Sequence, residues 1–331
     1  MPLKPLWART VLSIQKRIAA LVQRPPEPVS DNVFHEPYSP FYHYNTVIDV
    51  EALIKSYAMS NLKPNPCYIT NFLGVLIDPK FFPQLLEGKE GEVEGLPIPG
   101  NWHADMAEFA VALRAVSLAQ KSFTIIELGC GWGCWLNNTG AAARKRGLAV
   151  NLIGVEGDGG HIQFAKEACA TNGFSDNEIT LHHGIAAVES GVALFPRQDH
   201  AGLSWGLQPI FGATKEQRRE AIRSGGYDEL PTVALMEIAK NYERIDCLHI
   251  DIQGGETELI KGCLDFIGEK VSYIFIGTHS RQIEGALFNM LLNAGWKLEI
   301  ERPCFLKLDG PRPYTWVDGV QGWRNASLLA L

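Results

Sequence analysis

Several features that would narrow the function are absent from this 331-residue sequence. No apolar run approaches the roughly 20 residues that a membrane-spanning helix needs. The seven cysteines are odd in number and include no repeated CxxC pair, which argues against a disulfide framework and favours a reducing compartment. The net charge is -7, so no general nucleic-acid-binding surface is expected. The N-terminus also lacks a secretory signal, and these absences together predict a cytoplasmic protein.

Acidic residues are missing from residues 1–26 as well. The basic residues of this segment are Lys4, Arg9, Lys16, Arg17 and Arg24. Apolar residues recur between them at helical spacing, which predicts an amphipathic helix with a basic face. We favour a helix that docks on its own domain or on a second subunit, and we expect a homo-oligomer. The alternative is a peripheral membrane contact through residues 4–24, at an anionic lipid surface.

Two parts of the chain differ in character, with the boundary near residue 100. Residues 1–100 predict an N-terminal extension, helical or irregular, that includes a Pro-rich linker at 24–40 and serves as a cap or a dimerisation segment. In residues 101–331, strand-like and helix-like segments alternate, which predicts an α/β domain with a Rossmann-like, mostly parallel sheet and helices on both faces. We expect seven strands, of which the last two form an antiparallel hairpin at one edge.

Local patterns within 101–331 predict individual elements. Asp105, with Glu108 three residues later, indicates a capping box at a helix start. The segment "EITLHHGIAA" predicts one strand, and residues 188–228 predict a loop-rich insertion. Helices are expected at 48–58 in the first part and at 133–146, 160–172, 231–242, 256–267 and 282–294 in the second.

The stretch "IIELGCGWGCWLNN" places three glycines at alternate positions between a predicted strand and a predicted helix. A dinucleotide loop would need its third glycine one position later, where Cys134 stands, and the Gly-Lys-Ser/Thr of a P-loop is absent. Cys130 and Cys134 have no matching pair for zinc. Glu127 would repel a pyrophosphate but suits a ligand that carries an ammonium or sulfonium group. Glu156, at the end of the next predicted strand, is able to accept hydrogen bonds from both hydroxyls of a ribose.

This two-part pattern resembles the S-adenosylmethionine-dependent methyltransferases, over residues 101–325. The resemblance implies that the loop passes under the methionine part of S-adenosylmethionine, that the second-strand acid holds the ribose, and that the residues after the third strand flank the adenine. In related methyltransferases the start of the preceding helix often closes over the cofactor. The implied cofactor contacts are Glu127, Gly129, Gly131, Trp132, Glu156, Gly157, His183, Gly184, Ile185, Trp102 and His103.

The segment "IDCLHIDIQGGETELIKG" resembles the FkbM-type methyltransferases, whose pattern is roughly Asp-x-(Glu/Gln)-Gly-x-Glu. The matching positions are Asp251, Gln253, Gly254 and Glu256. That family is associated with O-methylation of sugars and secondary metabolites. The resemblance therefore implies an O-methyltransferase for a hydroxyl of a sugar, glycan or glycosylated metabolite. An NAD-type oxidoreductase and a non-catalytic binding module that kept the cofactor fold remain alternatives.

Methyl transfer to a hydroxyl gains from a general base, and bases in open α/β sheets project from the carboxyl ends of the strands. Asp251 ends the fourth predicted strand and His279 ends the fifth, so we predict a catalytic Asp–His pair. His249 is two residues deeper and is expected in the core. Gln253, Glu256 and Trp205 are predicted substrate contacts, and simple packing is the alternative for Trp205 and the other tryptophans.

The sequence leaves two mechanisms, one that needs a metal ion and one that does not. Some sugar O-methyltransferases use Mg²⁺, and Asp251 could supply one ligand, with Glu256 or Asp158 as weaker candidates. No dense cluster of Asp and Glu follows the fourth predicted strand. The sequence therefore favours a metal-free mechanism, with magnesium as the alternative.

Overall fold

A computed structural model describes residues 39–329. The predicted basic helix and most of the Pro-rich linker lie outside the described residues, and so does the membrane contact predicted for residues 4–24. Among the helices that are described, none has both the length and the apolar composition needed to cross a membrane.

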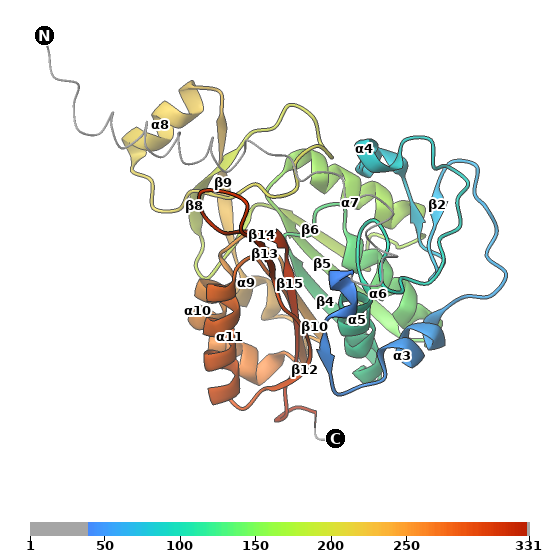
Figure 1. The fold of residues 1–331 in the computed structure, drawn as a ribbon. Helices are drawn as coiled ribbons and strands as arrows, with labels where there is room; N and C mark the ends of the chain where they lie inside the picture. Colours follow the sequence, from blue (N-terminus) through green and yellow to red (C-terminus); the bar gives the residue numbers. More distant parts are fainter. Residues whose placement is uncertain (1–38, 330–331) are drawn as a thin grey trace, which may run out of the picture.

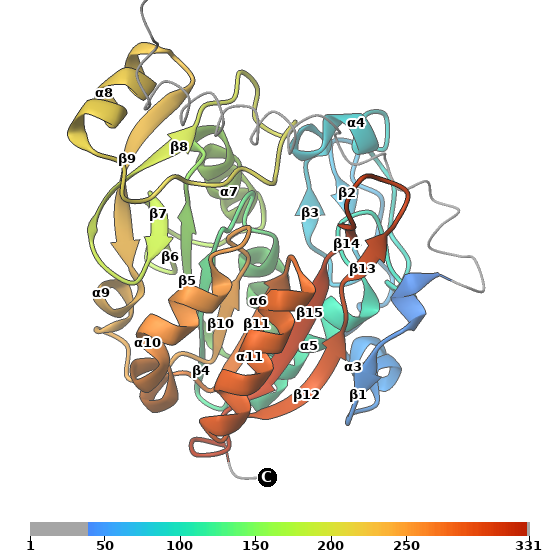
Figure 2. The same ribbon diagram turned by 60° about the vertical axis from the view of Figure 1, so that its left-hand side comes forward.

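An eight-stranded sheet lies at the centre of the molecule, in the order β1-β12-β15-β11-β10-β4-β5-β6 (Figures 1 and 2). Neighbours from β6 to β11 run parallel, and β15 runs antiparallel between β11 and β12. The strands are β1 (Asn45–Thr46), β4 (Ser122–Leu128), β5 (Ala149–Glu156), β6 (Ile179–His183), β10 (Cys247–Ile250), β11 (Tyr273–Thr278), β12 (Lys297–Arg302) and β15 (Gly319–Arg324). The seven predicted strands and the terminal antiparallel pair are confirmed, and the two-residue β1 adds an eighth at the edge.

Helices cover both faces of this sheet (Figure 2). One face carries α5 (Met106–Leu118), α6 (Cys134–Lys145) and α7 (Gly159–Thr171), and the other carries α9 (Leu235–Ala239), α10 (Glu256–Lys270) and α11 (Arg281–Asn293). Side chains of β4 alternate between the two cores: Phe123 and Ile125 join the first, whereas Ile126 and Leu128 join the second. A strand that is buried on both faces is apolar along its length, which explains the run "FTIIEL". The capping box of Asp105 and Glu108 opens α5 as predicted.

Residues 39–100 pack against the first of these cores. Their elements are η1 (Pro40–Tyr42), α3 (Val50–Tyr57), β2 (Ile69–Thr70), β3 (Leu76–Ile77), η2 (Pro79–Phe81) and α4 (Pro83–Leu86). Ile54, Ile77 and Phe81 are buried in the same cluster as α5 and α6. The predicted helix at 48–58 is confirmed as α3. The domain boundary at residue 100 stays a prediction, because this segment shares its core with the sheet.

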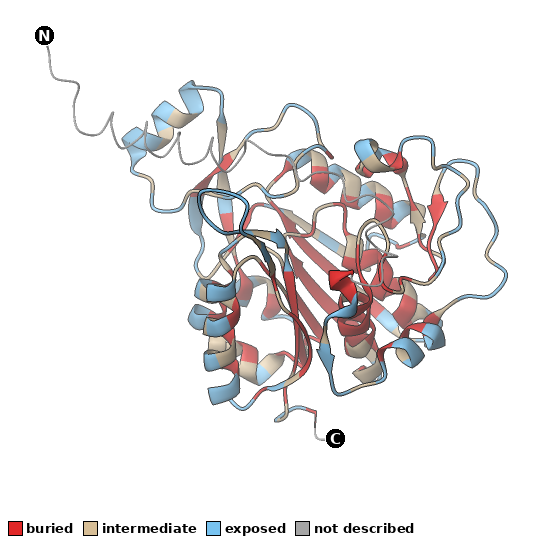
Figure 3. Ribbon diagram, viewed as in Figure 1, coloured by how far each residue is buried: buried red, intermediate tan, exposed pale blue. Residues whose placement is uncertain are grey.

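The insertion at 188–228 is more regular than the predicted loop. It contains β8 (Gly191–Pro196) and α8 (Lys215–Arg223), and it ends in β9 (Tyr227–Ala234). Together with β7 (Ile185–Ala187) these strands form a second sheet, in the order β7-β9-β8. No residue of α8 is buried, so the helix has no apolar stripe to reveal it, and Figure 3 shows it as largely exposed. The capping box of Thr214 and Gln217 was the one local signal of this helix.

Two further predictions were wrong in detail. Residues 231–234 belong to β9 rather than to a helix, because Thr232 and Val233 pair with β7 and β8, and α9 begins only at Leu235. The segment "EITLHHGIAA" breaks at Gly184 into β6 and β7, which lie in different sheets. The remaining hairpin, β13 (Phe305–Lys307) and β14 (Tyr314–Val317), stands beside the carboxyl ends of the central strands.

Candidate active site

The glycine loop crosses from β4 to α6 with all three of its glycines in the left-handed region, at φ of 78° for Gly129, 53° for Gly131 and 76° for Gly133. Gly129 is also pressed against the end of β10. A Cβ on this residue would lie 1.9 Å from the carbonyl oxygen of Asp251. Only glycine fits such a contact, and the loop therefore brings the first glycine and Asp251 together.

Glu127 caps the helix that follows the loop. Its buried carboxylate accepts hydrogen bonds from the backbone N–H groups of Trp135, at 3.2 Å, and Leu136, at 2.9 Å. Nδ1 of His249, in the core as predicted, lies 3.5 Å from the same carboxylate. Both oxygens of Glu127 are thus engaged within the protein, and its predicted contact with a cationic ligand stays a prediction.

Glu156 ends β5 beside the loop. Its carboxylate accepts the N–H of Gly131, at 2.9 Å, and the N–H of Asp158, at 2.7 Å. Burial raises the pKa of Glu156 to about 7, although the backbone hydrogen bonds oppose this shift. Gly157 follows, and its carbonyl oxygen lies 3.1 Å from Nε2 of His183. With a pKa near neutrality, Glu156 can be a neutral carboxyl or a carboxylate, and either form can accept a hydrogen bond from a ligand hydroxyl.

The predicted adenine pair is closely packed in this structure. A Cβ on Gly184 would meet the carbonyl oxygen of Pro231, in β9, at 2.7 Å. Ile185 is 5% exposed and joins a small hydrophobic cluster with Ala193 and Phe195. The insertion therefore covers this end of the site.

Three further predicted cofactor residues form an aromatic group under the N-terminal segment. The Trp132 ring is 2% exposed and stacks on Phe81, with centroids 5.4 Å apart, so it packs in the core, and its implied contact with the cofactor stays a prediction. Trp102 and His103 lie beside it. Both ring nitrogens of His103 are buried and have no hydrogen-bond partner among residues 39–329. Burial lowers the pKa of His103 to about 3, which keeps its ring neutral.

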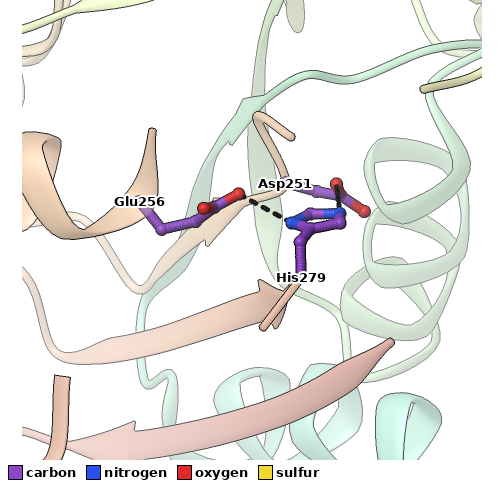
Figure 4. A group of neighbouring side chains, drawn as sticks. All are labelled: Asp251, Glu256 and His279. Atoms are coloured by element: carbon purple, nitrogen blue, oxygen red, sulfur yellow. Dashed lines mark hydrogen bonds and ion pairs between the residues drawn. The ribbon is translucent and has the colours of Figure 1, made fainter. Parts of the chain in front are cut away.

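Asp251, Glu256 and His279 meet at the ends of β10 and β11, as Figure 4 shows. The His279 ring lies between the two carboxylates: Nε2 is 3.1 Å from Oδ1 of Asp251, and Nδ1 is 3.0 Å from Oε1 of Glu256. The predicted Asp–His pair is therefore brought together, and Glu256 joins it as a third member. Glu256 is fully buried, whereas the Asp251 side chain is 40% exposed.

The turn "DIQGGE" builds this cluster locally. Gln253 takes a left-handed φ of 59°, and its side-chain amide donates to Oδ1 of Asp251 at 3.0 Å. Oε1 of Glu256 accepts the N–H groups of Ile252, at 3.2 Å, and Gly254, at 3.1 Å. Gln253 and Glu256, predicted to contact substrate, thus position Asp251 and His279 in this structure.

His279 and Asp251 stabilise each other's charged form in this cluster. Burial alone would lower the pKa of His279, but its hydrogen bonds to Asp251 and Glu256 outweigh burial and raise the pKa to about 11. Burial would likewise raise the pKa of Asp251, and the hydrogen bond and charge of His279 hold it below the ordinary range. At neutral pH His279 is therefore protonated and Asp251 is ionised.

A cation at this cluster would compete with those hydrogen bonds. Ligand atoms of Asp251, Glu256 and His279 all lie within 4.8 Å of one another. However, Asp251 faces Nε2 of His279 and Glu256 faces Nδ1, so the two carboxyl groups lie on different sides of the ring. Asp158, the other metal candidate, caps α7 through the N–H of His161 instead.

Sequence reasoning missed a buried network that adjoins the cluster. Arg302, on β12, pairs with Asp105 at 2.7 Å, and both side chains are buried. Burial raises the pKa of Glu108 to about 8, helped by the charges of Asp105 and Asp251 and opposed by Arg302. These residues come from distant segments, and only the capping box marked two of them in the sequence.

Other aromatic residues of the insertion and of the C-terminal tail differ in how far they are exposed. Trp323 is fully buried and packs in the core, whereas Phe211 and Trp316 are exposed by 53% and 40%. Trp205 stacks on His161 and lies over the glycine loop rather than over Asp251.

Comparison with known proteins agrees with this geometry. Residues 126–298 match the Methyltransferase FkbM domain. A protein of Jannaschia sp. (strain CCS1), named "Putative methyltransferase", is 46% identical over 264 residues, which cover 80% of this chain and 94% of that protein. The chain belongs to the FkbM methyltransferase family. It is therefore an S-adenosylmethionine-dependent methyltransferase, and the oxidoreductase alternative is set aside.

Solved structures resemble this methyltransferase at much lower sequence identity. The human methyltransferase 10 domain containing protein is 12% identical, with a TM-score of 0.37 over 66% of this chain and 82% of that one. The ribosomal protein L11 methylase from Lactobacillus delbrueckii subsp. bulgaricus is 14% identical, with a TM-score of 0.33 over 72% of this chain and 87% of that one.

Proposed function

We propose that this methyltransferase acts on a hydroxyl group of a sugar, a glycan or a glycosylated metabolite. The observation that supports the proposal is the asymmetric environment of the Asp251 carboxylate. Oδ1 accepts hydrogen bonds from His279 and Gln253, whereas Oδ2 accepts none from the described part of the chain. With a 40% exposed side chain, Asp251 offers a fixed and ionised proton acceptor to an incoming hydroxyl.

The residues around the glycine loop fit the methyl donor. Glu156 offers a carboxylate to ribose hydroxyls beside the glycine loop. The ring nitrogens of His103, which have no partner among the described residues, would gain hydrogen-bond partners from the amino-acid end of such a ligand. When bound, S-adenosylmethionine supplies an electrophilic methyl group on a sulfonium.

The transfer itself is an in-line displacement. With the donor bound, its sulfonium would supply the methyl group and the sulfur leaving group, and Oδ2 of Asp251 would take the proton that the attacking hydroxyl loses. His279, held in the protonated form between Asp251 and Glu256, fixes the direction of the Asp251 carboxylate. Holding the reacting atoms in line is worth about 7–11 kcal/mol, so positioning supplies much of the rate.

A metal-dependent version of the same reaction is the second candidate. It is favoured by the short distances among the ligand atoms of Asp251, Glu256 and His279. The metal-free version remains our proposal, because each of the two His279 nitrogens already has a carboxylate partner.

A transfer assay with a labelled methyl donor tests the proposal. Nucleotide sugars, lipid-linked glycans and matched amine acceptors would be compared, each with and without EDTA. We expect label on a hydroxyl oxygen of a sugar acceptor, and equal rates in EDTA. Transfer to amines alone would contradict the hydroxyl acceptor, and a loss in EDTA that Mg²⁺ restores would replace the metal-free mechanism. Cofactor binding without turnover on any acceptor would favour the non-catalytic module.

A further inference from the structure

The β13–β14 hairpin is fixed to the strand end that carries His279. The Thr315 hydroxyl, on β14, donates a hydrogen bond to the carbonyl oxygen of His279 at 2.8 Å. Just before β13, the thiol of Cys304 donates to the carbonyl oxygen of Thr278 at 3.1 Å. Both strands of the hairpin are therefore attached to the end of β11, next to the candidate active site.

The two faces of this hairpin differ. Leu306 and Thr315 are cross-strand partners, and such partners share a face, so Leu306 lies on the face that meets His279. Lys307, the next residue, points to the opposite face, and its Nζ lies 4.7 Å from the centre of the Trp316 ring. The face with Leu306 is therefore turned toward the end of β11, and Trp316 belongs to the other face.

Apolar surface is exposed beside this strand end. Leu306 is 44% exposed, and Leu308, one residue beyond β13, is 75% exposed. The turn that follows is also exposed, as Figure 3 shows. Apolar surface of this kind gains free energy when an apolar group covers it. We call Leu306 and Leu308 the leucine ledge.

We propose that the leucine ledge holds an apolar chain or aglycone attached to the acceptor sugar. This inference rests on the proposed function, and it narrows the acceptors to amphiphilic glycosides, such as a sugar on an alkyl or isoprenoid chain. The hydrogen bond from Thr315 to the end of β11 holds the ledge in a constant position relative to Asp251, the proposed proton acceptor. One amphiphilic molecule is thereby able to place its hydroxyl at Asp251 and its apolar part on the ledge.

The size and position of the ledge favour an acceptor over a second copy of the chain or a bilayer. A stable protein interface buries roughly 800 Å² on each partner, which is far more than two leucine side chains supply. Stable anchoring to a bilayer likewise takes more than one small apolar contact. Neither occupant would need the hairpin to be bonded to the strand of His279, whereas an acceptor that reaches Asp251 lies beside that strand end.

Calorimetry with methyl glucoside and hexyl glucoside tests the ledge, on protein saturated with S-adenosylhomocysteine. The two probes differ only in their apolar chain. We expect hexyl glucoside to bind about tenfold more tightly, because each buried methylene adds to the affinity. We expect this preference to be largely lost in Leu306→Ser and in Leu308→Ser. Leu308 lies outside β13 and is mostly exposed, so its variant serves if Leu306→Ser does not fold.

Three further variants are matched controls. Leu292→Ser makes the same change at a 54% exposed leucine of α11, and Trp316→Ala changes the other face of the hairpin. Leu306→Met keeps an apolar side chain on the ledge. All three should keep the preference for hexyl glucoside, and all variants should bind S-adenosylhomocysteine as the wild type does.

The outcomes separate the ledge from the proposed function. Equal binding of the two glucosides by the wild type, or a preference that both serine variants of the ledge keep, overturns the ledge. A preference that only Trp316→Ala loses places the apolar chain on the other face and also overturns it. If the transfer assay labels no sugar hydroxyl while the ledge variants still lose the preference, the proposed function is wrong and the apolar site stands.

Discussion

The two halves of the candidate site are built from different materials. At the ends of β4 and β5, the donor side consists mainly of glycine backbone and one carboxylate, Glu156, whose pKa burial raises to about 7. At the ends of β10 and β11, the acceptor side consists of His279 held between the carboxyl groups of Asp251 and Glu256. Close packing around glycine backbone therefore determines the properties of the donor side, and side-chain charge determines those of the acceptor side. Substitutions should accordingly affect the donor side through close contacts and the acceptor side through ionisation.

The largest expected effect is at Asp251, which belongs to the charged half alone. Asp251→Asn keeps the size of the side chain but removes the proton acceptor, so kcat should fall about 10²–10⁴-fold. The affinity for S-adenosylhomocysteine should stay unchanged, because donor binding depends on the other half. Asp265→Asn, at an exposed position on α10, is the matched control and should behave as the wild type. Equal loss of donor affinity and kcat in Asp251→Asn would remove the distinction between the halves.

The contact at which the halves meet gives the next largest effect. Gly129 and Gly147 have nearly the same φ, at 78° and 77°, but a Cβ on Gly129 would lie 1.9 Å from the Asp251 carbonyl oxygen, whereas a Cβ on Gly147 meets nothing within 4 Å. Gly147→Ala should cost about 1 kcal/mol of unfolding free energy, from backbone strain alone. Gly129→Ala adds the clash and should cost about 3 kcal/mol. Urea unfolding measures both, and equal costs would show that the contact between the halves is dispensable.

Much of this division could be predicted from the sequence, because each half has a local motif. The glycine spacing with Glu127 and Glu156 and the turn around Asp251 are short patterns within single strand–loop–helix units. The meeting of Asp251 and His279 followed from the rule that parallel strands end at one edge. These are the parts of a fold that local sequence and sheet topology determine together.

The parts that could not be predicted depend on contacts between distant segments. The stack of Phe82, Trp205 and His161 joins three regions of the chain, and no spacing rule connects them. The helix α8 has no buried face and therefore no periodic apolar signal. Trp132, an implied cofactor contact, is covered by Phe81 of the N-terminal segment, whose packing the motif does not encode.

The pKa of His279 predicts how stability and kcat depend on pH at the acceptor side. Its pKa of about 11 lies above the ordinary 6.5, so its ion pairs stabilise the fold fully below pH 6.5 and are lost as the pH rises through 11. Removal of this charge in His279→Gln should raise the pKa of Asp251, since burial alone raises it. We expect the acid limb of kcat to move to higher pH and kcat at neutral pH to fall about tenfold. An unchanged acid limb would mean that His279 does not set the ionisation of Asp251.

The smallest expected effect belongs to the donor side, at its single titrating carboxylate. The pKa of Glu156, about 7, lies above the ordinary 4.5, so its burial costs stability increasingly as the pH rises from 4.5 through 7. Only the ionised carboxylate accepts hydrogen bonds from both ribose hydroxyls, so S-adenosylhomocysteine should bind more tightly, by about tenfold, as the pH rises from 6 to 8.

Glu156→Gln should bind S-adenosylhomocysteine more weakly and lose this pH dependence. The carboxyl groups of Glu94 and Glu108, whose pKa values burial raises to about 7 and about 8, remain in the variant and account for any residual slope. Asp251→Asn should keep most of the slope, because the pKa of Asp251 is held below its ordinary range and Asp251 does not itself change charge between pH 6 and 8. The opposite result would be a pH dependence of S-adenosylhomocysteine binding that persists in Glu156→Gln and vanishes in Asp251→Asn. Donor binding would then follow the charge of the acceptor side, and the assignment of the two halves would be reversed.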